Sequence, residues 1–390
     1  MEPNFINRTI WTGDNLDILR GINSATADLI YLDPPFNSNR NYAAPVGSKA
    51  AGAAFKDTWT LSDLDVAWAG YIADEHPAVA YLLSGAGMAH SAGMQSYLTM
   101  MAVRLLEMQR ILKPTGSIYL HCDPTASHYL KQLMDAVFGR DQFRNEIVWC
   151  YSSGGASKKH FSRKHDVLLL YGRTRDCVHN VIRVAYATPG VEGRPGFHPE
   201  GKMLQDWWTD IGIISTTGSE RAGYPTQKPL KLLERIITAS SNENDVVLDP
   251  FAGCATACVA AEKLKRRWVG IDLFPKAAEL VNERLRGEMG DLFHHGFVTT
   301  RTDIPQRTDI HTPKNYRQNR HVLYGEQEGR CAGCRTHFEF RHLEVDHVVP
   351  QSQGGSHHLK NLQLLCGHCN RVKGDRPMEY LLAQLPRVLA

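Results

Sequence analysis

Short apolar runs alternate with helix-period patterns along much of the chain. The segment 26–36 reads as a buried strand that ends in a Pro-Pro turn, and 117–121 reads as a second strand. Strand and helix signals then alternate from 229 to 288. This rhythm predicts a parallel sheet covered by helices, an α/β fold of the Rossmann-like kind. Helices are expected at 97–112, 124–138, 229–240, 254–265 and 275–288, with further strands at 245–249 and 267–272.

Three segments interrupt the alternation. Residues 43–96 are rich in Ala and Gly, which favours a mobile loop with short helices. Residues 147–225 are rich in Gly, aromatic and basic residues, which favours inserted hairpins and loops. Residues 297–320 have the Thr, Arg, Asp, Pro and Gln composition of a linker. We therefore expect a first domain over 1–296 and a second, small domain over 321–390.

Composition narrows the class of protein. The chain has 390 residues, of which 43% are hydrophobic and 22% charged, as in folded globular domains. No apolar run approaches the roughly 18 residues that span a bilayer, and the first residues lack the layout of a signal peptide. We therefore expect a cytoplasmic protein with no membrane partner. The net charge of +3 conceals two basic segments, 151–230 and 301–390, which fit either a polyanion contacted in two places or two solvated faces.

The first motif that carries chemistry is Asp33-Pro34-Pro35-Phe36. It follows a strand, and ligands of open α/β sheets bind at the carboxyl ends of the strands. Two prolines fix the backbone, so the Asp33 carboxylate and the Pro34 carbonyl can accept N–H groups from one amine, while Phe36 offers a stacking face. This set suits an exocyclic amino group on a base. A rigid turn with an ordinary capping Asp is the alternative.

The second motif is a strand, a small-residue turn and a helix start, running from 246 to 256. Asp249 begins the turn and Gly253 lies within it, and the next strand ends in a second acid, Asp272. This arrangement binds nucleosides, with the second acid on the ribose hydroxyls. The segment contains neither Gly-x-Gly-x-x-Gly nor Gly-Lys-Ser/Thr, so a pyrophosphate ligand is not expected. Asp249 fits a ligand with an amine or sulfonium charge.

Together the two motifs resemble the DNA amino-methyltransferases that use S-adenosylmethionine, in the order with the catalytic motif first. Gly13-Asp14-Asn15 and the segment 225–229 (Pro-Thr-Gln-Lys-Pro) resemble the flanking motifs of that family, and the likeness covers about 1–295. One departure is Ala255, where the family turn ends in Gly. The resemblance implies the cofactor-binding residues Asp14, Lys228, Asp249, Phe251, Ala252, Gly253 and Asp272.

The resemblance also implies the reaction. The methyl group would pass in line to an amine held by Asp33 and Pro34, on a base flipped out of double-stranded DNA and stacked on Phe36. Asp at the first motif position resembles the adenine-N6 enzymes, and cytosine-N4 methylation stays the alternative. The target-recognition region would be about 147–225, in which Trp207 and Trp208 are expected in the core. The expected phosphate contacts there are Lys158, Lys159, Arg163 and Lys164.

The last 60 residues hold four of the nine cysteines as two Cys-x-x-Cys pairs, which predicts reduced thiols around a structural Zn²⁺. The other five are expected to be core thiols, with Cys254 in the cofactor turn as the exception. Between the pairs stands Glu344-Val345-Asp346-His347, followed by a Gly-Gly turn. Residues 320–378 resemble the HNH endonucleases, whose small ββα fold is held by zinc. The zinc ligands would be Cys331, Cys334, Cys366 and Cys369.

Phosphodiester hydrolysis needs a base for water and a cation on the leaving oxygen. The resemblance makes His347 the base, places Mg²⁺ or Mn²⁺ on Asp346 and Asn370, and lets Asn361 brace the loop. The family often has His where this chain has Asn370, and His368 is a possible substitute. The neighbouring His357 and His358 are expected to be solvated. A zinc ribbon that only binds DNA is the alternative.

The sequence thus predicts two enzymes in one chain: a DNA adenine methyltransferase and an HNH nuclease, which fits restriction–modification in one polypeptide. Two alternatives stay open, a cytosine-N4 enzyme and a methyltransferase whose zinc module only anchors DNA. A prokaryotic or phage origin is expected. The sequence leaves the recognition site and the oligomeric state open, a dimer included.

Overall fold

The computed structural model describes residues 2–35, 42–43, 54–55, 68, 72–73, 75–152, 156–215, 220–224, 226–290, 296–309 and 316–388. The chain forms two compact units. The first contains residues 1–58 and 104–309, and the second contains residues 59–103 and 310–390. The first unit therefore extends to residue 309, beyond the expected boundary at 296.

The first unit is built on a nine-stranded sheet with the order β10-β6-β7-β5-β2-β11-β12-β1-β13. Strand β7 is antiparallel to both of its neighbours, and the other pairings are parallel. The mostly parallel sheet expected from the sequence is confirmed. The strands are β1 (Thr9–Thr12), β2 (Ala27–Leu32), β5 (Leu112–Cys122), β6 (Phe143–Cys150), β7 (His165–Gly172), β10 (Trp207–Trp208), β11 (Val246–Asp249), β12 (Arg267–Asp272) and β13 (Thr299–Arg301).

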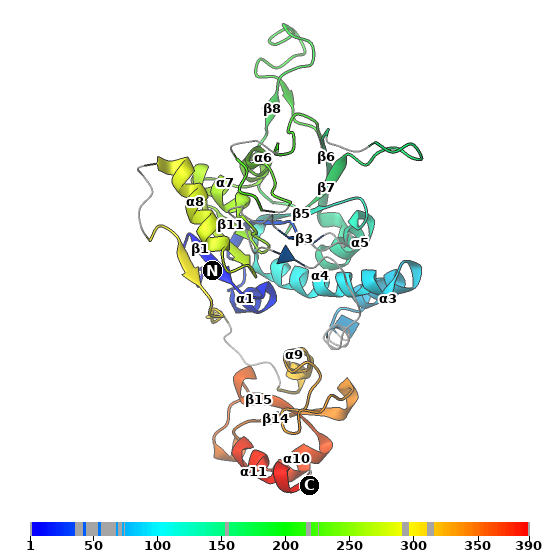
Figure 1. Ribbon diagram of the computed structural model, residues 1–390, viewed down its shortest axis with the longest axis vertical. Helices are drawn as coiled ribbons and strands as arrows, with labels where there is room; N and C mark the ends of the chain where they lie inside the picture. Colours follow the sequence, from blue (N-terminus) through cyan, green and yellow to red (C-terminus); the bar gives the residue numbers. More distant parts are fainter. Residues whose placement is uncertain are drawn as a thin grey trace. The chain divides into compact units, whose positions relative to one another are not determined.

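Helices cover the sheet because its central strands are apolar on both faces. Every residue of β2 and β11 is buried, as central parallel strands require. Helices α6, α7 and α8 pack side by side (Figure 1), and their apolar faces share one core with residues such as Ile236, Val259 and Trp268. Among the described residues, the helices of the first unit are α1 (Asn15–Gly21), α5 (Ser127–Phe138), α6 (Leu230–Ser240), α7 (Thr256–Lys263) and α8 (Ala277–Met289). Helix α3 (Pro77–Ala89) and the first part of α4 (Ala92–Ile111) fall in the second unit, and α4 continues into the first.

The structure corrects two segment boundaries. The region 147–225 is not wholly an insert, because it contains the second half of β6, all of β7 and β10, which are strands of the main sheet. The predicted linker 297–320 contains β13, which pairs with β1, and it ends in a 3₁₀ turn, Tyr316–Asn319. Apolar residues are sparse in β13, so the sequence pattern did not reveal this edge strand.

Several side chains and short hairpins complete the first unit. Trp208 is buried, but Trp207 is 51% exposed, so its expected place in the core is wrong. Its side chain leaves the core because neighbours along a strand point to opposite faces. Cys122, Cys254 and Cys258 are buried, whereas Cys150 and Cys177 are half-buried. The short pairs are β3 (Tyr42–Ala43) with β4 (Ala54–Phe55), and β8 (Arg183–Val184) with β9 (Lys202–Met203).

The second unit carries a β-hairpin with helices before and after it in the sequence. Strands β14 (Leu343–His347) and β15 (Leu362–Cys366) are antiparallel, with Leu343 opposite Cys366. Helices α9 (Arg320–Glu326), α10 (Gly367–Lys373) and α11 (Met378–Val388) belong to this unit. Its small core contains leucines and cysteines from these elements. Within the described part of the chain, no helix is both long and apolar enough to cross a bilayer.

Candidate functional site

Four carboxylates lie at one edge of the main sheet. Asp33 follows β2, Asp249 ends β11, Asp272 ends β12, and Asp14 comes two residues after β1. These four strands are neighbours and run parallel, so their carboxyl ends meet at the same edge. This is the edge at which ligands of open α/β sheets bind.

Lys228 is brought to Asp33 from a distant part of the chain. Its Nζ atom lies 2.6 Å from Asp33 Oδ2, and the lysine is only 8% exposed. The other oxygen, Asp33 Oδ1, is buried and has no hydrogen-bond partner among the described residues. A buried acceptor without a partner costs free energy, so the arrangement suits a ligand that donates an N–H group to Oδ1.

The Asp33-Pro34-Pro35-Phe36 motif is only partly described. Pro34 is buried and Pro35 half-buried, and both follow Asp33 directly. Phe36, the expected stacking residue, lies outside the described residues. The neighbouring Tyr31, in β2, is fully described and buried.

The turn after β11 is held by Asp272. Its Oδ2 atom accepts a hydrogen bond from the Gly253 backbone N–H at 2.6 Å, and its Oδ1 accepts one from the Phe274 N–H at 2.7 Å. Gly253 has φ +54°, and a Cβ there would come within 2.9 Å of the Tyr224 ring. The turn therefore requires glycine at this position.

The same turn holds Phe251, Ala252 and Ala255. Phe251 donates its backbone N–H to Asp249 Oδ1 at 3.1 Å, and Ala252 is buried. Ala255 adopts φ +52° and ψ +45°, the left-handed conformation that glycine takes without strain. Ala255, which stands where the family turn ends in Gly, therefore has a strained backbone conformation.

The buried carboxylates beside the turn favour the binding of a cation. Burial raises the pKa of Asp249 well above its ordinary value, and the charges of Asp33 and Asp272 raise it further. Burial also raises the pKa of Asp272. A bound cation would offset this cost, because an opposite charge stabilises the ionised carboxylates. The acidic residues and the glycine turn thus fit the positively charged, nucleoside-containing S-adenosylmethionine.

The segment around Asp14 is tied to the cofactor turn. Asn15 donates its side-chain amide to the Pro250 carbonyl at 2.6 Å. Arg104 donates to Asn15 Oδ1 at 2.6 Å and to Asp14 Oδ1 at 2.8 Å. Asp14 also caps helix α1 through the Leu16 N–H. Sequence reasoning missed Arg104, since nothing in its helical pattern distinguishes it.

A buried polar chain runs beneath Asp33. The Tyr31 hydroxyl lies 2.9 Å from His121 Nδ1, and His121 Nε2 lies 3.1 Å from Asp166 Oδ2. Tyr151 donates to Asp166 Oδ1 at 2.9 Å. Although burial alone would raise the pKa of Asp166, the hydrogen bond and charge of His121 and the charge of Lys228 lower it. The sequence analysis did not predict this chain, which is assembled by the pairing of β5 with β7.

The basic residues expected on DNA lie on the loop between β6 and β7. Lys158, Lys159 and Arg163 are exposed, and Lys164 is half-buried. Figure 1 shows this loop projecting from the sheet. The Arg163 guanidinium lies 3.5 Å from the Thr125 hydroxyl, just after β5. Strands β5 and β2 are parallel neighbours, so their carboxyl ends lie at the same edge of the sheet. The contact therefore places Arg163 at the edge that carries Asp33.

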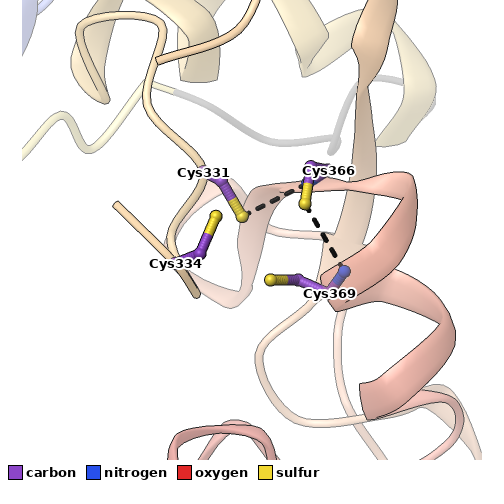
Figure 2. A group of neighbouring side chains, drawn as sticks. All are labelled: Cys331, Cys334, Cys366 and Cys369. Carbon is purple, nitrogen blue, oxygen red and sulfur yellow. Dashed lines mark hydrogen bonds between the residues drawn. The ribbon is translucent and has the colours of Figure 1, made fainter. Parts of the chain in front are cut away.

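The four paired cysteines converge in the second unit (Figure 2). The sulfur atoms of Cys331, Cys334, Cys366 and Cys369 all lie within 4.8 Å of one another. A tetrahedral zinc ion with bonds of about 2.3 Å separates its sulfur ligands by about 3.8 Å, so this cluster fits the ion. The Cys366 N–H donates to Cys331 Sγ at 3.2 Å, and the Cys369 N–H donates to Cys366 Sγ at 3.4 Å. Such N–H donors stabilise thiolates.

His347 ends β14 beside a second histidine. Its Nε2 lies 3.0 Å from His357 Nδ1, and Gln351 Nε2 lies 3.2 Å from both of these nitrogens. Tyr316 stacks on His357 at 5.2 Å between ring centroids. Burial and the charge of His357 lower the pKa of His347, which favours its neutral form, the form that a base requires. His357 is exposed as expected, but its contact with His347 was not predicted.

The residues expected to hold a divalent ion already have protein partners. Lys373 Nζ lies 2.9 Å from Asp346 Oδ2, although this lysine is only 1% exposed, and Gln363 donates to the same oxygen at 3.1 Å. Asn370 donates its amide to Glu344 Oε2 at 2.6 Å. These bonds leave Asp346 Oδ1 and the Asn370 amide oxygen as the candidate ligands. Their chemistry suits a hard cation, but the ammonium of Lys373 opposes it.

Asn361 joins the two sides of the loop that follows His347. Its side chain donates to the Val349 carbonyl at 3.0 Å and to the Ser356 carbonyl at 2.9 Å, and it accepts from the Val349 N–H at 2.9 Å. Gly355 is required here, because a Cβ at this position would overlap the Val349 carbonyl. The sequence analysis predicts this bracing role for Asn361.

Comparison with known proteins matches two family models to the chain. The DNA methylase family model matches residues 27–283, and the HNH endonuclease family model matches residues 331–376. Among curated relatives, the type II methyltransferase M.BamHI of Bacillus amyloliquefaciens is 27% identical over 292 residues, which cover 72% of this chain and 58% of the relative. M.HpaI of Haemophilus parainfluenzae is 32% identical over 185 residues, 47% of this chain and 58% of the relative. The chain thus spans just over half the length of these two relatives.

Other relatives and solved structures are similar over larger shares of their own lengths. The DNA adenine methyltransferase YhdJ of Escherichia coli K12 is 26% identical over 68% of this chain and 78% of its own length. A DNA modification methylase of Thermus thermophilus is 20% identical and covers 76% of this chain and all of its own, with a TM-score of 0.44. The cytosine-N4-specific PvuII methyltransferase is 14% identical over 77% of this chain and 97% of its own, with a TM-score of 0.46. With its carboxylate edge and its cluster of four cysteines, the chain belongs to the N6/N4 DNA methylase family and carries a C-terminal HNH endonuclease domain.

Proposed function

We propose that the first domain is a site-specific DNA adenine-N6 methyltransferase that uses S-adenosylmethionine. The observation that carries the proposal is the Asp33 carboxylate, whose Oδ2 is held by Lys228 while the buried Oδ1 lacks a partner among the described residues. An exocyclic amine of a base is the donor that this oxygen fits. The Asp at the first motif position, and similarity to the DNA adenine methyltransferase YhdJ over 68% of the chain, support the choice of adenine.

Asp33 and Pro34 would prepare the amine for attack. Asp33 Oδ1 and the Pro34 carbonyl each accept one amino N–H, which draws the nitrogen lone pair away from the ring and toward the incoming methyl group. The methyl group would pass from the sulfonium to the nitrogen, its bond to sulfur would break to leave a neutral thioether, and one proton would leave the nitrogen for Asp33 Oδ1. Lys228 keeps Oδ2 fixed, so the carboxylate presents Oδ1 in one orientation.

The cofactor would lie along the carboxylate edge. Asp249 would face its positive charge and Asp272 its ribose, while Gly253 lets it approach the backbone. Asp14, Phe251 and Ala252 would line the same site, with Lys228 between this site and Asp33. When bound, S-adenosylmethionine supplies the electrophilic methyl group.

The second domain would cleave DNA. His347, held by His357 and Gln351, would take a proton from the attacking water. Asp346 Oδ1 and the Asn370 amide oxygen would hold Mg²⁺ or Mn²⁺, which stabilises the leaving oxygen. A domain that only anchors DNA is the competing candidate, favoured by the buried ammonium of Lys373 beside Asp346.

Methylated-nucleoside analysis of DNA incubated with the protein and cofactor tests the first proposal. We expect N6-methyladenine, and Asp33→Ala should abolish it while cofactor binding persists. N4-methylcytosine would overturn the base assignment, and no methylation on any duplex would overturn the function.

The proposed nuclease activity of the second domain is tested by nicking or cleavage of DNA with Mg²⁺ or Mn²⁺, which should be lost in His347→Ala. Equal activity in His347→Ala would exclude His347 as the base.

A further inference from the structure

Phe161 has its whole side chain in solvent, with an exposed fraction of 100%. It lies on the loop between β6 and β7, in which residues 157–162 form a hydrogen-bonded turn. The Ser157 N–H donates to Ser162 Oγ at 3.0 Å, and Ser157 Oγ accepts the backbone N–H groups of Lys159 and His160 at 3.2 and 3.3 Å. The turn therefore holds the Phe161 ring outward rather than letting it fold onto the core.

The loop emerges at the edge of the sheet that carries Asp33. Cys122, the last residue of β5, pairs with Val167 near the start of antiparallel β7. The residues that precede β7 therefore extend past the carboxyl end of β5. Since β5 and β2 run parallel side by side, Asp33 lies at this same edge. The sheet register thus places Phe161 on the side from which a base would enter.

The surroundings of Phe161 identify the partner. Lys158, Lys159 and Arg163 are exposed on the same turn, so the aromatic ring stands among three cations. Backbone phosphates attract such cations, while base pairs offer a stack into which an apolar ring can insert. Two other aromatic residues of this region, Phe197 and Trp207, are only 42% and 51% exposed. Phe197 packs against Tyr186, and the Trp207 ring lies beneath Lys202.

We propose that Phe161 inserts into the base stack of the duplex and fills the space left when the target base is flipped toward Asp33. The inference rests on the proposed methylation of a flipped base. Flipping breaks one base pair and two stacking contacts, and a ring in the vacated place recovers part of that loss. The basic residues of the turn would hold the two strands on either side.

The test uses the full-length protein and a duplex that contains its own methylation site, once this site has been found by sequencing methylated DNA. Phe161→Ala should lower kcat/KM for the fully paired duplex by about 10- to 100-fold, the range expected for one lost base–aromatic contact. On a duplex whose target base faces an abasic position, less work is needed for flipping. There, Phe161→Ala should come within about threefold of the unaltered protein.

Two further variants sharpen the result. Phe161→Trp keeps a ring and should retain most of the activity on the paired duplex. Tyr81→Ala removes another exposed ring, on α3. It should change kcat/KM by the same factor on the paired and the abasic duplex. An equal loss for Phe161→Ala on both duplexes, or no loss on either, would overturn the proposal. Failure of the proposed function looks different, because the unaltered protein would then methylate neither duplex.

Discussion

Lys228 Nζ and Asp33 Oδ2 lie 2.6 Å apart, although 195 residues separate them in the sequence. The pair joins the catalytic motif to the Gln-Lys-Pro segment before α6, and both side chains are largely buried. The family resemblance assigned Lys228 to the cofactor. The observed contact leads us to propose a second role, in which the lysine fixes the carboxylate that would accept the amine.

Lys228→Gln should therefore reduce kcat more than it reduces cofactor affinity. Without the ammonium the Asp33 carboxylate can rotate, and a misplaced catalytic group costs about 100-fold in rate. We expect kcat to fall by about that factor while the Kd for S-adenosylmethionine, measured by calorimetry, stays within about threefold. Lys228→Arg keeps the charge with a different shape, so it should restore part of the rate.

The opposite pattern would identify Lys228 as a cofactor residue only. In that case Lys228→Gln would weaken S-adenosylmethionine binding strongly and leave kcat at saturating cofactor unchanged. Lys231→Gln is the matched control, since this lysine lies three residues further along the chain and its side chain is 63% exposed.

Asp249→Asn should stabilise the cofactor-free protein and weaken cofactor binding at the same time. Burial raises the pKa of Asp249, so ionisation of this carboxyl favours the unfolded chain. The folded protein therefore loses stability as the pH rises from about 3.9, the value in the unfolded chain, through the raised pKa. The asparagine removes this cost. We expect a higher melting temperature without cofactor, and a weaker affinity for S-adenosylmethionine because the opposing charge is gone.

The same carboxylate predicts a pH dependence of cofactor binding. The ionised form of Asp249 favours the cation, so affinity should increase as pH rises through the raised pKa of this group. In Asp249→Asn this increase should be smaller. Calorimetry across a pH series measures both, and parallel pH profiles in the two proteins would show that Asp249 does not face the positive charge.

The central strands of the fold were predictable because they are apolar runs bounded by turns. Buried β2, β11 and β12 carry that signal, and so do the helices between them. Strands β1 and β13 were missed, since each is four residues or fewer and contains Thr beside few apolar residues. Such short strands, whether internal like β1 or at the edge like β13, are defined by their partners rather than by their own pattern.

The candidate sites, like the fold, were only partly predictable from the sequence. The motif residues Asp33, Asp249 and Asp272 follow strands, so the sequence predicted that they share one edge. Their partners could not be predicted in this way, because Lys228 and His121 reach the site only through the folded arrangement. Spacing along the chain carries no information about such contacts.

Zinc should be needed for the second domain to fold. Cys366→Ser removes one of four sulfur ligands and should release the ion, since a structural zinc site contributes its binding free energy to folding. Elemental analysis should show the loss of about one zinc ion per chain. In an unfolding experiment, the separate transition of this less stable domain should disappear. Cys177→Ser, at a cysteine outside the cluster, is the control and should leave the zinc content unchanged. Full zinc retention in Cys366→Ser would contradict the four-sulfur site.

Lys373 should oppose a divalent ion at Asp346. Its ammonium lies 2.9 Å from Asp346 Oδ2, so a second cation on the same carboxylate is repelled. At an effective dielectric constant near 20, charges about 4 Å apart interact by about 4 kcal/mol, so the repulsion is large enough to measure. Lys373→Met, which keeps an apolar chain of similar length, should therefore bind Mn²⁺ at least about tenfold more tightly by calorimetry.

Two controls define this last measurement. Asp346→Asn in the Lys373→Met background should remove the gain, because the ion then loses its carboxylate ligand. Lys360→Met changes an exposed lysine of the same domain and should leave Mn²⁺ affinity unchanged. If Lys373→Met binds Mn²⁺ no more tightly than the unaltered chain, the ion does not bind at Asp346. The balance between the DNA-cleaving and the DNA-anchoring roles of this domain would then shift toward anchoring.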